Sequence, residues 1–424
     1  ARRRTWCRSR APSSRPRARP TPGGPSGLDL AVPVGRGTYR GNVTCRILAV
    51  LVSVLALIAC TAATTAPTAS EHADAPVAPA QAPATPPQSI TITGVDLHDG
   101  TVLRYGDTYY LYGTMYGCGF HWGDPGTPWC GFGVSTAPSL AGPWSQPTLL
   151  FDPDTAAPGT GKTFRELCRL YGAGCFNPRV VQRAGWGPND GAWILWFNAP
   201  ADFTMRRANA YWVMGGNNPA GPFGPQAGPP FGSVNKPALW SCHDNGDFSL
   251  VLDNPRPPML LCTMADQTLA AERLDQWGTG GQPGQPKRHQ LAGATRAEAP
   301  GAYRDPATGV WIMTWNELNC GYCSGAPTSY DTAPTVDGPW TSPATVNSQW
   351  GSTPLGRRGI SATSCGGQPR TVFEVDGAAY QLIDLWGAGG NQTGAGIHFE
   401  RLEYRGEGAP NQPHQPFTPW RCGA

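Results

Sequence analysis

The stretch LHDGTVLRYGDTYYLYGT, residues 97–114, places an acidic residue, Asp99, ahead of a run rich in aromatic and β-branched residues. This order predicts the opening of a β-meander with a strand over 108–114. The stretch EAPGAYRDPATGVWIMTW, residues 298–315, has the same order, with Glu298 at its start. Two carboxylates far apart in sequence, each at the start of a β-unit, indicate a radial fold that brings strand starts together at one axis.

The rest of residues 90–424 repeats this kind of unit. Short aromatic and β-branched runs are separated by Gly, Pro, Asn and Asp, as in all-β proteins. A Gly-Pro-aromatic corner recurs at 142–144, 221–223 and 338–340, and two further units lack it. Five units of roughly 45–65 residues have the size of propeller blades. We therefore predict an all-β, five-bladed β-propeller over 90–424, because the alternative, a β-sandwich with long loops, predicts no such recurrence.

The N-terminal part has a different composition. Residues 1–42 are rich in Arg, Pro and Gly, which cannot bury a core, so they are interpreted as a disordered or mis-started leader. Within 43–60, the uncharged apolar run 47–59 is shorter than the roughly 20 residues that span a bilayer and fits a secretory signal.

The apolar run ends in Leu57-Ile58-Ala59-Cys60. This tetrapeptide resembles the bacterial lipobox, in which the Cys is lipidated and becomes the mature N-terminus; an ordinary signal peptide cut nearby is the alternative. Residues 61–89, rich in Ala, Pro and Thr, are typical of a semi-extended linker. We predict a secreted protein held on a bacterial cell surface through lipid on Cys60.

Charge and cysteine content narrow the function further. Of the 32 basic and 29 acidic residues, 11 Arg and Asp29 lie within 1–59, so the remainder holds 21 basic and 28 acidic residues. This net negative charge argues against nucleic acid or an anionic membrane surface as a partner. Ten cysteines follow residue 90, an even number that predicts up to five disulfides in an exported protein, with Cys118–Cys130 and Cys168–Cys175 as candidate pairs of near neighbours. Cys320-Gly321-Tyr322-Cys323 is interpreted as a structural disulfide, since no second pair completes a zinc site.

Two motifs resemble those of glycoside hydrolase family 43. His98-Asp99-Gly100-Thr101-Val102 and the strand after it resemble the first-blade motif of that family, and Glu298-Ala299-Pro300 resembles its acid-bearing motif. The similarity covers about residues 92–405, with some likeness to the galactan-cleaving branch. The resemblance implies a secreted five-bladed propeller that cleaves arabinose-, xylose- or galactose-containing glycans.

The resemblance also implies roles for four residues. Inverting glycosidases pair a carboxylate base, which activates water, with a carboxylic acid, which protonates the leaving oxygen. The family pattern puts the base at Asp99 and the acid at Glu298. Asn177 stands in the segment that carries a third carboxylate in the family, and Gln368 stands where galactan-cleaving members have Gln; both are expected to orient the sugar or the water. The structural alternatives are a turn residue for Asp99 and a surface charge for Glu298.

Further residues are candidates for sugar binding. Asp247 opens the third unit and is expected at the axis. Sixteen Trp is a high number, and aromatic faces stack on sugar rings. The candidates at or just after the ends of inner strands are Tyr116, Trp122, Trp315 and Trp386.

No cofactor is required by this chemistry, and a calcium ion on the propeller axis is left open. The expected partner is a poly- or oligosaccharide, with the protein a monomer. The alternative function is a non-catalytic carbohydrate-binding propeller on the cell surface, which Asn177 favours because an amide cannot raise the pKa of a neighbouring acid by like-charge repulsion.

The lipobox gives a first prediction. The exported protein should fractionate with membranes, and Cys60→Ser should release it, because a single thiol carries the anchor. Fatty-acid labelling of both forms measures this directly. Equal membrane association of the two forms, with neither labelled, would contradict the lipobox interpretation.

Overall fold

The computed structural model describes residues 86–423 apart from 187–189, 201–210, 226–230, 232–234, 244–245, 285–290, 292–294, 318–320, 342–357 and 408–414. The leader, the signal segment, Cys60 and most of the 61–89 linker lie outside the described residues. Ala80–Ala424 form one compact unit. Within its described part, no helix has the length and apolar character needed to cross a membrane.

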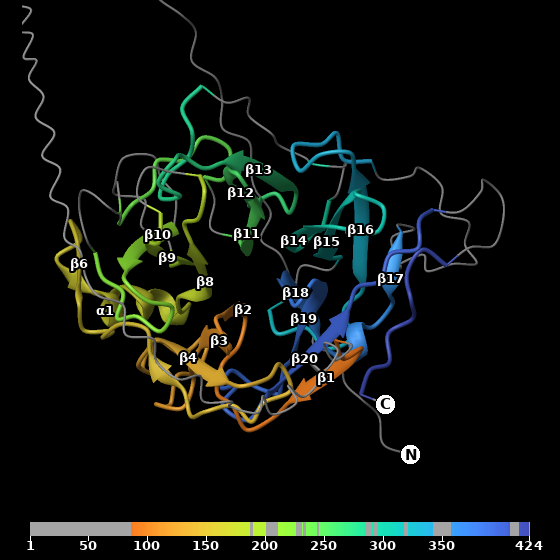
Figure 1. Cartoon of the computed structure of the whole chain (residues 1–424). Coiled ribbons are helices and arrows are strands. Elements are labelled where there is room, and N and C mark those ends of the chain that lie inside the picture. The colour runs from red at the N-terminus through yellow and green to blue at the C-terminus, as the bar shows by residue number, and fades with distance from the viewer. Residues whose placement is uncertain are drawn as a thin grey trace, which may run out of the picture. The chain divides into compact units, whose positions relative to one another are not determined.

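The unit is a five-bladed β-propeller, as predicted, and each blade is an antiparallel sheet (Figure 1). Each of the three Gly-Pro-aromatic corners follows the third strand of its blade. In order along the chain the blades are: β2 (Val102–Tyr105), β3 (Thr108–Thr114), β4 (Phe132–Ala137) and β5 (Thr148–Leu149); β8 (Phe176–Gln182), β9 (Trp193–Asn198) and β10 (Tyr211–Gly216); β11 (Phe248–Asp253), β12 (Arg256–Thr263) and β13 (Leu269–Arg273); β14 (Glu298–Arg304), β15 (Trp311–Asn316), β16 (Thr328–Ala333) and β17 (Gly359–Ser361); β18 (Gln368–Val375), β19 (Ala378–Leu385), β20 (Gly396–Arg401) and β1 (Ser89–Ile92).

Short elements decorate the connection between the first two blades. They are the hairpin β6 (Ala156–Ala157) and β7 (Lys162–Thr163), the helix α1 (Phe164–Cys168) and the 3-10 turn η1 (Leu170–Gly172). Thr163 caps α1, because its hydroxyl accepts the Glu166 amide while the Glu166 carboxylate accepts the Thr163 amide. A second 3-10 turn, η3 (Ser364–Gly366), leads into β18.

The fifth blade joins the two ends of the propeller. Strand β1 pairs antiparallel with β20, in register from Ser89 opposite Glu400 to Ile92 opposite Ile397. In Figure 1 the orange β1 accordingly lies beside the blue β20. The last blade therefore contains β1, the first strand among the described residues, and β1 is the outermost strand of that blade.

The core consists of apolar layers between neighbouring blades. Phe132 of β4 and Phe197 of β9, for example, have ring centroids 5.1 Å apart in the layer between the first two blades. Comparable layers separate the other neighbouring blades. Burying each large apolar side chain contributes about 1.5–3 kcal/mol, so the layers fix the angle of every blade to the axis. The starts of the innermost strands β2, β8, β11, β14 and β18 are thereby brought to one end of that axis.

Four disulfides are present among the described residues, and both predicted pairs of near neighbours are confirmed. They are Cys118–Cys130, Cys168–Cys175, Cys242–Cys262 and Cys365–Cys422. Cys323 is also disulfide-bonded, whereas Cys320 lies outside the described residues. Disulfides in this number are typical of exported proteins.

The cysteine pattern gives a second prediction. Thiol titration of the denatured, unreduced protein should detect none of the ten cysteines after residue 90. Reduction should lower the melting temperature, because each native disulfide lost from a small domain costs about 2–5 kcal/mol. Reaction of most of the ten cysteines, or zinc bound in stoichiometric amount, would contradict the disulfide interpretation.

Candidate active site

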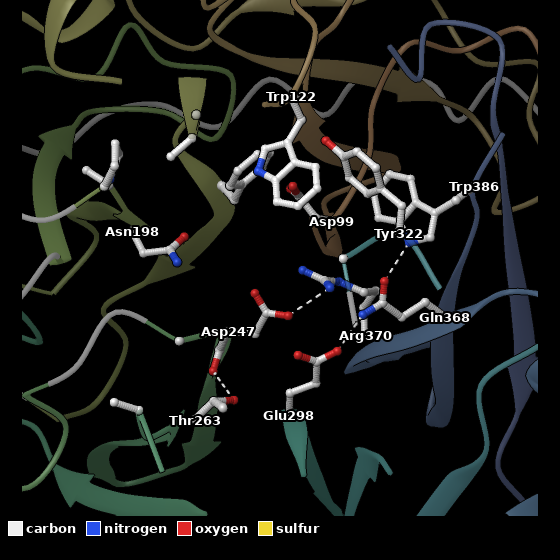
Figure 2. A pocket seen from close by; sticks show the side chains of 18 of the residues that line it. Asp99, Trp122, Asn198, Asp247, Thr263, Glu298, Tyr322, Gln368, Arg370 and Trp386 are labelled. Carbon is white, nitrogen blue, oxygen red and sulfur yellow. Dashed lines mark hydrogen bonds and ion pairs between the residues drawn. The ribbon is translucent and has the colours of Figure 1, made fainter. Parts of the chain in front are cut away.

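A cavity of about 650 Å³ lies at the end of the axis where the innermost strands begin. Figure 2 shows the side chains around it. Six of the residues singled out from the sequence line this cavity, although they are up to 287 positions apart: Asp99, Trp122, Asp247, Glu298, Gln368 and Trp386. The radial convergence predicted from Asp99 and Glu298 is therefore present.

Asp99 is held rigidly although it borders the cavity. Its backbone is in the left-handed region, with φ of 55°, and its amide donates to Asp384 Oδ2 at 3.0 Å. Both carboxylate oxygens accept the hydroxyl of Thr114, at 2.9 and 3.1 Å. Burial raises the pKa of Asp99 to about 7, against the opposing effects of Arg370, the Thr114 hydrogen bond and Arg179. A carboxyl with this pKa can exchange a proton near neutral pH.

Glu298, the first residue of β14, belongs to a chain of hydrogen bonds. Its Oε1 accepts Asn316 Nδ2 and Gln368 Nε2, each at 2.7 Å. The indole Nε1 of Trp386 in turn donates to Gln368 Oε1 at 2.7 Å. Figure 2 shows this chain running from Trp386 through Gln368 to Glu298. The orientation of the Glu298 carboxyl is therefore tied to an aromatic side chain of the cavity wall.

Arg370, which the sequence analysis did not identify, lies at the centre of the polar groups. Its guanidinium forms an ion pair with Asp247 at 2.7 Å, lies 3.6 Å from Asp384, and donates to Asn177 Oδ1 at 2.7 Å. The pKa of Arg370 is raised despite burial, because Asp247, Asp384 and Asp99 surround it. Its position two residues after Gln368, in the same strand, was the available signal in the sequence.

Asp384 is the second group that was missed. It is fully buried in β19, opposite Gln368 in the register of the fifth blade. Burial raises its pKa to about 8, and Arg370 lowers it. Two carboxyls with raised pKa values, Asp99 and Asp384, thus lie in one buried cluster with Arg370.

The register of the blades corrects the interpretation of Asn177. Phe176 lies opposite Asn198 as Glu298 lies opposite Asn316, and in both blades a register shift follows at once. Phe176, which lines the cavity, therefore occupies the position of Glu298. Asn177 corresponds instead to Ala299, since both have a positive φ, of 58° and 53°.

Asn177 lies beneath the cavity surface. It is fully buried and is not among the lining residues. Its Nδ2 donates to Asp247 Oδ1 at 2.7 Å and its Oδ1 accepts Arg370, so it orders these two groups. The amide fits here because it can donate to a carboxylate and accept from a guanidinium at the same time.

Some of the aromatic candidates line the wall of the cavity, and the others are buried in the protein core. Trp122 and Trp386 line the cavity together with Tyr322, another residue missed in the sequence. Tyr116 is fully buried behind them, with its hydroxyl 2.7 Å from that of Tyr322, so it supports the wall rather than facing the cavity. Trp315 is corrected as well, because it is buried in the apolar layer between the third and fourth blades and does not line the cavity.

One group of potential metal ligands occurs in the part of the chain that the structure describes: Cys365, Glu400 and Cys422. The two cysteines form a disulfide with each other, which leaves their sulfur atoms unsuited to bind a cation as thiolates. This group therefore gives no support for a metal site, and the axial calcium ion stays untested.

Solved structures of known proteins share this fold. An exo-β-1,3-galactanase from Phanerochaete chrysosporium with galactose superimposes with a TM-score of 0.52 at 14% identity, over 73% of this chain and 61% of that one. An exo-β-1,3-galactanase from Clostridium thermocellum gives 0.51 at 14% identity, over 74% and 63%. A family 43 β-1,3-galactosidase with galactodeoxynojirimycin gives 0.51 at 14% identity, over 73% and 91%.

The chain thus spans about three fifths of the length of the two galactanases. At this identity the likeness establishes the fold, which is the propeller of family 43 glycosidases. No protein-family model matches the chain, and neither does a curated protein sequence.

The buried carboxyls give a third prediction, on stability against pH. In the folded protein the pKa values of Asp99 and Asp384 are raised to about 7 and 8 from the ordinary value of 3.8. Both carboxyls therefore bind protons more tightly in the folded protein than in the unfolded chain. Their contribution to stability is therefore full below about pH 4 and is lost as pH rises through 7 to 8. Asp384→Asn should flatten this decline, since it removes one titrating group and a negative neighbour of Asp99. Melting temperatures from pH 5 to pH 8 measure the slope.

Asp107→Asn is the matched control, because Asp107 is fully exposed on the turn between β2 and β3. Its slope should equal that of the wild type. The same slope for Asp384→Asn as for the wild type would show that these carboxyls are not protonated in the folded state.

Proposed function

We propose that this protein is a glycoside hydrolase that cleaves glycans with inversion at the anomeric carbon. The observation that carries this proposal is the placement of Asp99 and Glu298, from different blades, on one cavity with an aromatic wall. Two carboxyl groups and stacking surfaces are the requirements of glycosidic bond cleavage. The fold shared with family 43 glycosidases supports the same class of reaction.

In this mechanism Asp99 is the general base. Its ionised carboxylate removes a proton from a water molecule, which attacks the anomeric carbon from the face opposite the leaving group. The hydrogen bonds from Thr114 fix the direction of its oxygens, so that the carboxylate is oriented before substrate binds. A pKa of about 7 makes the base strong enough to take the proton while leaving a large ionised fraction at neutral pH.

Glu298 is the general acid. Its Oε1 accepts the amides of Asn316 and Gln368, which orient the carboxyl whose proton would pass to the glycosidic oxygen. As the bond to the leaving sugar breaks, the proton neutralises the developing alkoxide. We expect the two carboxyl groups to stand about 6.5–9.5 Å apart, which leaves room for the water.

The other polar groups would orient the sugar. Asp247 and Arg370 form an ion pair at the cavity surface, and Asn198 lines the cavity next to them. Such groups donate to and accept from sugar hydroxyls in fixed directions. Galactose-containing glycans are the first substrates to test, because the structural neighbours include two galactanases and a galactosidase. Arabinose- and xylose-containing glycans complete the panel.

We further propose that the enzyme works outside the cell as a monomer on a lipid anchor at Cys60. The disulfides fit an oxidising compartment. The 61–89 linker would give the propeller reach from the membrane to a polymeric substrate.

One observation favours a second function, a propeller that binds carbohydrate without cleaving it. Phe176 occupies the register position of Glu298 in the second blade, so that blade presents an apolar ring to the cavity in place of a third carboxylate. Glycan binding without product release would select this alternative.

The fourth prediction tests the roles of the carboxyls. Glu298→Gln should lower kcat by about 10²–10⁴, with the largest loss on substrates with poor leaving groups, because it removes the proton donor. Asp99→Asn should lower kcat on all substrates. Initial rates on aryl glycosides and polysaccharides measure both effects, and NMR of the first product shows its anomeric configuration.

Glu374→Gln is the matched control, since Glu374 lies on a cavity lined by the far ends of the inner strands and should keep wild-type rates. Wild-type activity in both Asp99→Asn and Glu298→Gln would exclude the proposed mechanism. Retention of the anomeric configuration would exclude inversion but would leave the proposed glycosidase activity standing.

A further inference from the structure

A second cavity, of about 480 Å³, adjoins the candidate active site. The two cavities share Trp122, Gly321, Tyr322 and Trp386, so these four residues, called the partition, lie where the two chambers meet. The remaining lining of the second chamber is Ser324 and the backbone-rich segment 387–390. The chamber with Asp99 and Glu298 is charged, whereas the described residues that line the second chamber include no charged side chain.

The partition is built from loops of three different blades. Trp122 comes from the first blade, Tyr322 from the fourth and Trp386 from the fifth. The ring centroids of Trp122 and Tyr322 are 5.2 Å apart, and those of Tyr322 and Trp386 are 4.7 Å apart. Figure 2 shows the three rings in a row above the polar groups. Trp122 keeps 42% of its surface exposed, which leaves ring surface for a ligand.

Contacts between the loops hold the partition in place. The Trp122 amide donates to the Gly390 carbonyl at 2.9 Å, and Asn391 Nδ2 donates to the Phe120 carbonyl at 2.6 Å. The disulfide Cys118–Cys130 closes the loop that carries Trp122. The second chamber is therefore formed before any ligand binds.

Two glycines make the close approach of these loops sterically feasible. A Cβ on Gly321 would lie 2.8 Å from the ring of Trp122. A Cβ on Gly390 would lie 2.6 Å from the Trp122 carbonyl oxygen. Both distances are well below van der Waals contact, so larger residues would displace Trp122.

The hydrogen-bond chain indicates which part of a substrate lies at the partition. Glu298 is joined through Gln368 to Trp386, a member of the partition. The general acid must lie beside the glycosidic oxygen, and the leaving group lies beyond that oxygen. We infer from this link that the partition stands on the leaving-group side of the bond, with the second chamber continuing in that direction.

We propose that the second chamber binds a neutral sugar unit on the leaving-group side of the cleaved bond, with Trp122 and Tyr322 as its stacking surfaces. This inference rests on the proposed glycosidase function and adds that the preferred substrate is an oligo- or polysaccharide rather than a glycoside with a small leaving group. A neutral unit is expected because the described residues that line this chamber include no cation for a uronic acid, whose carboxylate would lose hydration on entering.

The test compares an oligosaccharide from the cleaved glycan with the glycosyl fluoride of the same sugar. The fluoride has a one-atom leaving group and does not reach the second chamber. Ala388→Trp fills that chamber from an exposed position that does not line the first. The ratio of kcat/KM for oligosaccharide to kcat/KM for fluoride should fall about tenfold or more, because both the aromatic stacking contact and the space for the sugar are lost.

Ala184→Trp is the matched control, because Ala184 is exposed on the cavity at the far end of the inner strands. Its ratio should equal that of the wild type. If Ala388→Trp fails to fold, Ser324→Trp fills the second chamber from its other side and should give the same fall in the ratio. An oligosaccharide with a uronic acid as its leaving unit should be cleaved about tenfold less efficiently than its neutral counterpart.

The outcomes separate the two proposals. Hydrolysis of neither substrate by the wild type would overturn the glycosidase function and this inference with it. Hydrolysis of both, with a ratio unchanged by Ala388→Trp and Ser324→Trp, would overturn the second chamber as a sugar site while the proposed function stands. A preference for the oligosaccharide whose leaving unit is a uronic acid would overturn the restriction of the second chamber to neutral sugar units.

Discussion

The ion pair between Arg370 and Asp247, with Asp384 on the other side of the guanidinium, is the interaction on which the site depends. A propeller that collects acidic side chains at one axis brings like charges together, and burial makes each charge more costly. Arg370 offsets both effects from the centre of the cluster, and Asn177 fills its remaining contact with a neutral acceptor. Removing one member of a buried charge pair typically costs about 3–5 kcal/mol, so the cluster supports the fold as well as the chemistry.

The ring closure transmits this constraint to the whole domain. Each blade meets its neighbours through an apolar layer, and β1 completes the fifth blade beside β20. A blade cannot shift without disturbing two layers, since such layers are packed nearly as densely as crystals. The carboxyls at the strand starts are therefore held by the full ring.

The two carboxyls proposed for catalysis have different surroundings. Asp99 lies in the buried cluster with Arg370, Arg179 and Asp384, where burial raises its pKa. Glu298 instead accepts the amides of Asn316 and Gln368, which link it to the aromatic partition. Under the proposed mechanism, these different surroundings would distinguish the base from the acid.

The sequence by itself determined the fold class, because strand periodicity and corner residues act locally and recur in every blade. It also predicted that Asp99 and Glu298 meet at the axis and that two pairs of cysteines form disulfides, since each belongs to a short motif or a close pair. Arg370, Asp384 and Tyr322 were decided only by the tertiary structure, since their importance comes from neighbours in other strands or blades. The register shift in β8 decided that Phe176 and not Asn177 faces the cavity, and packing between blades decided that Trp386 is wall and Trp315 is core. Side-chain direction at the axis depends on such shifts and on the angle between blades, and both arise only when distant strands pack together.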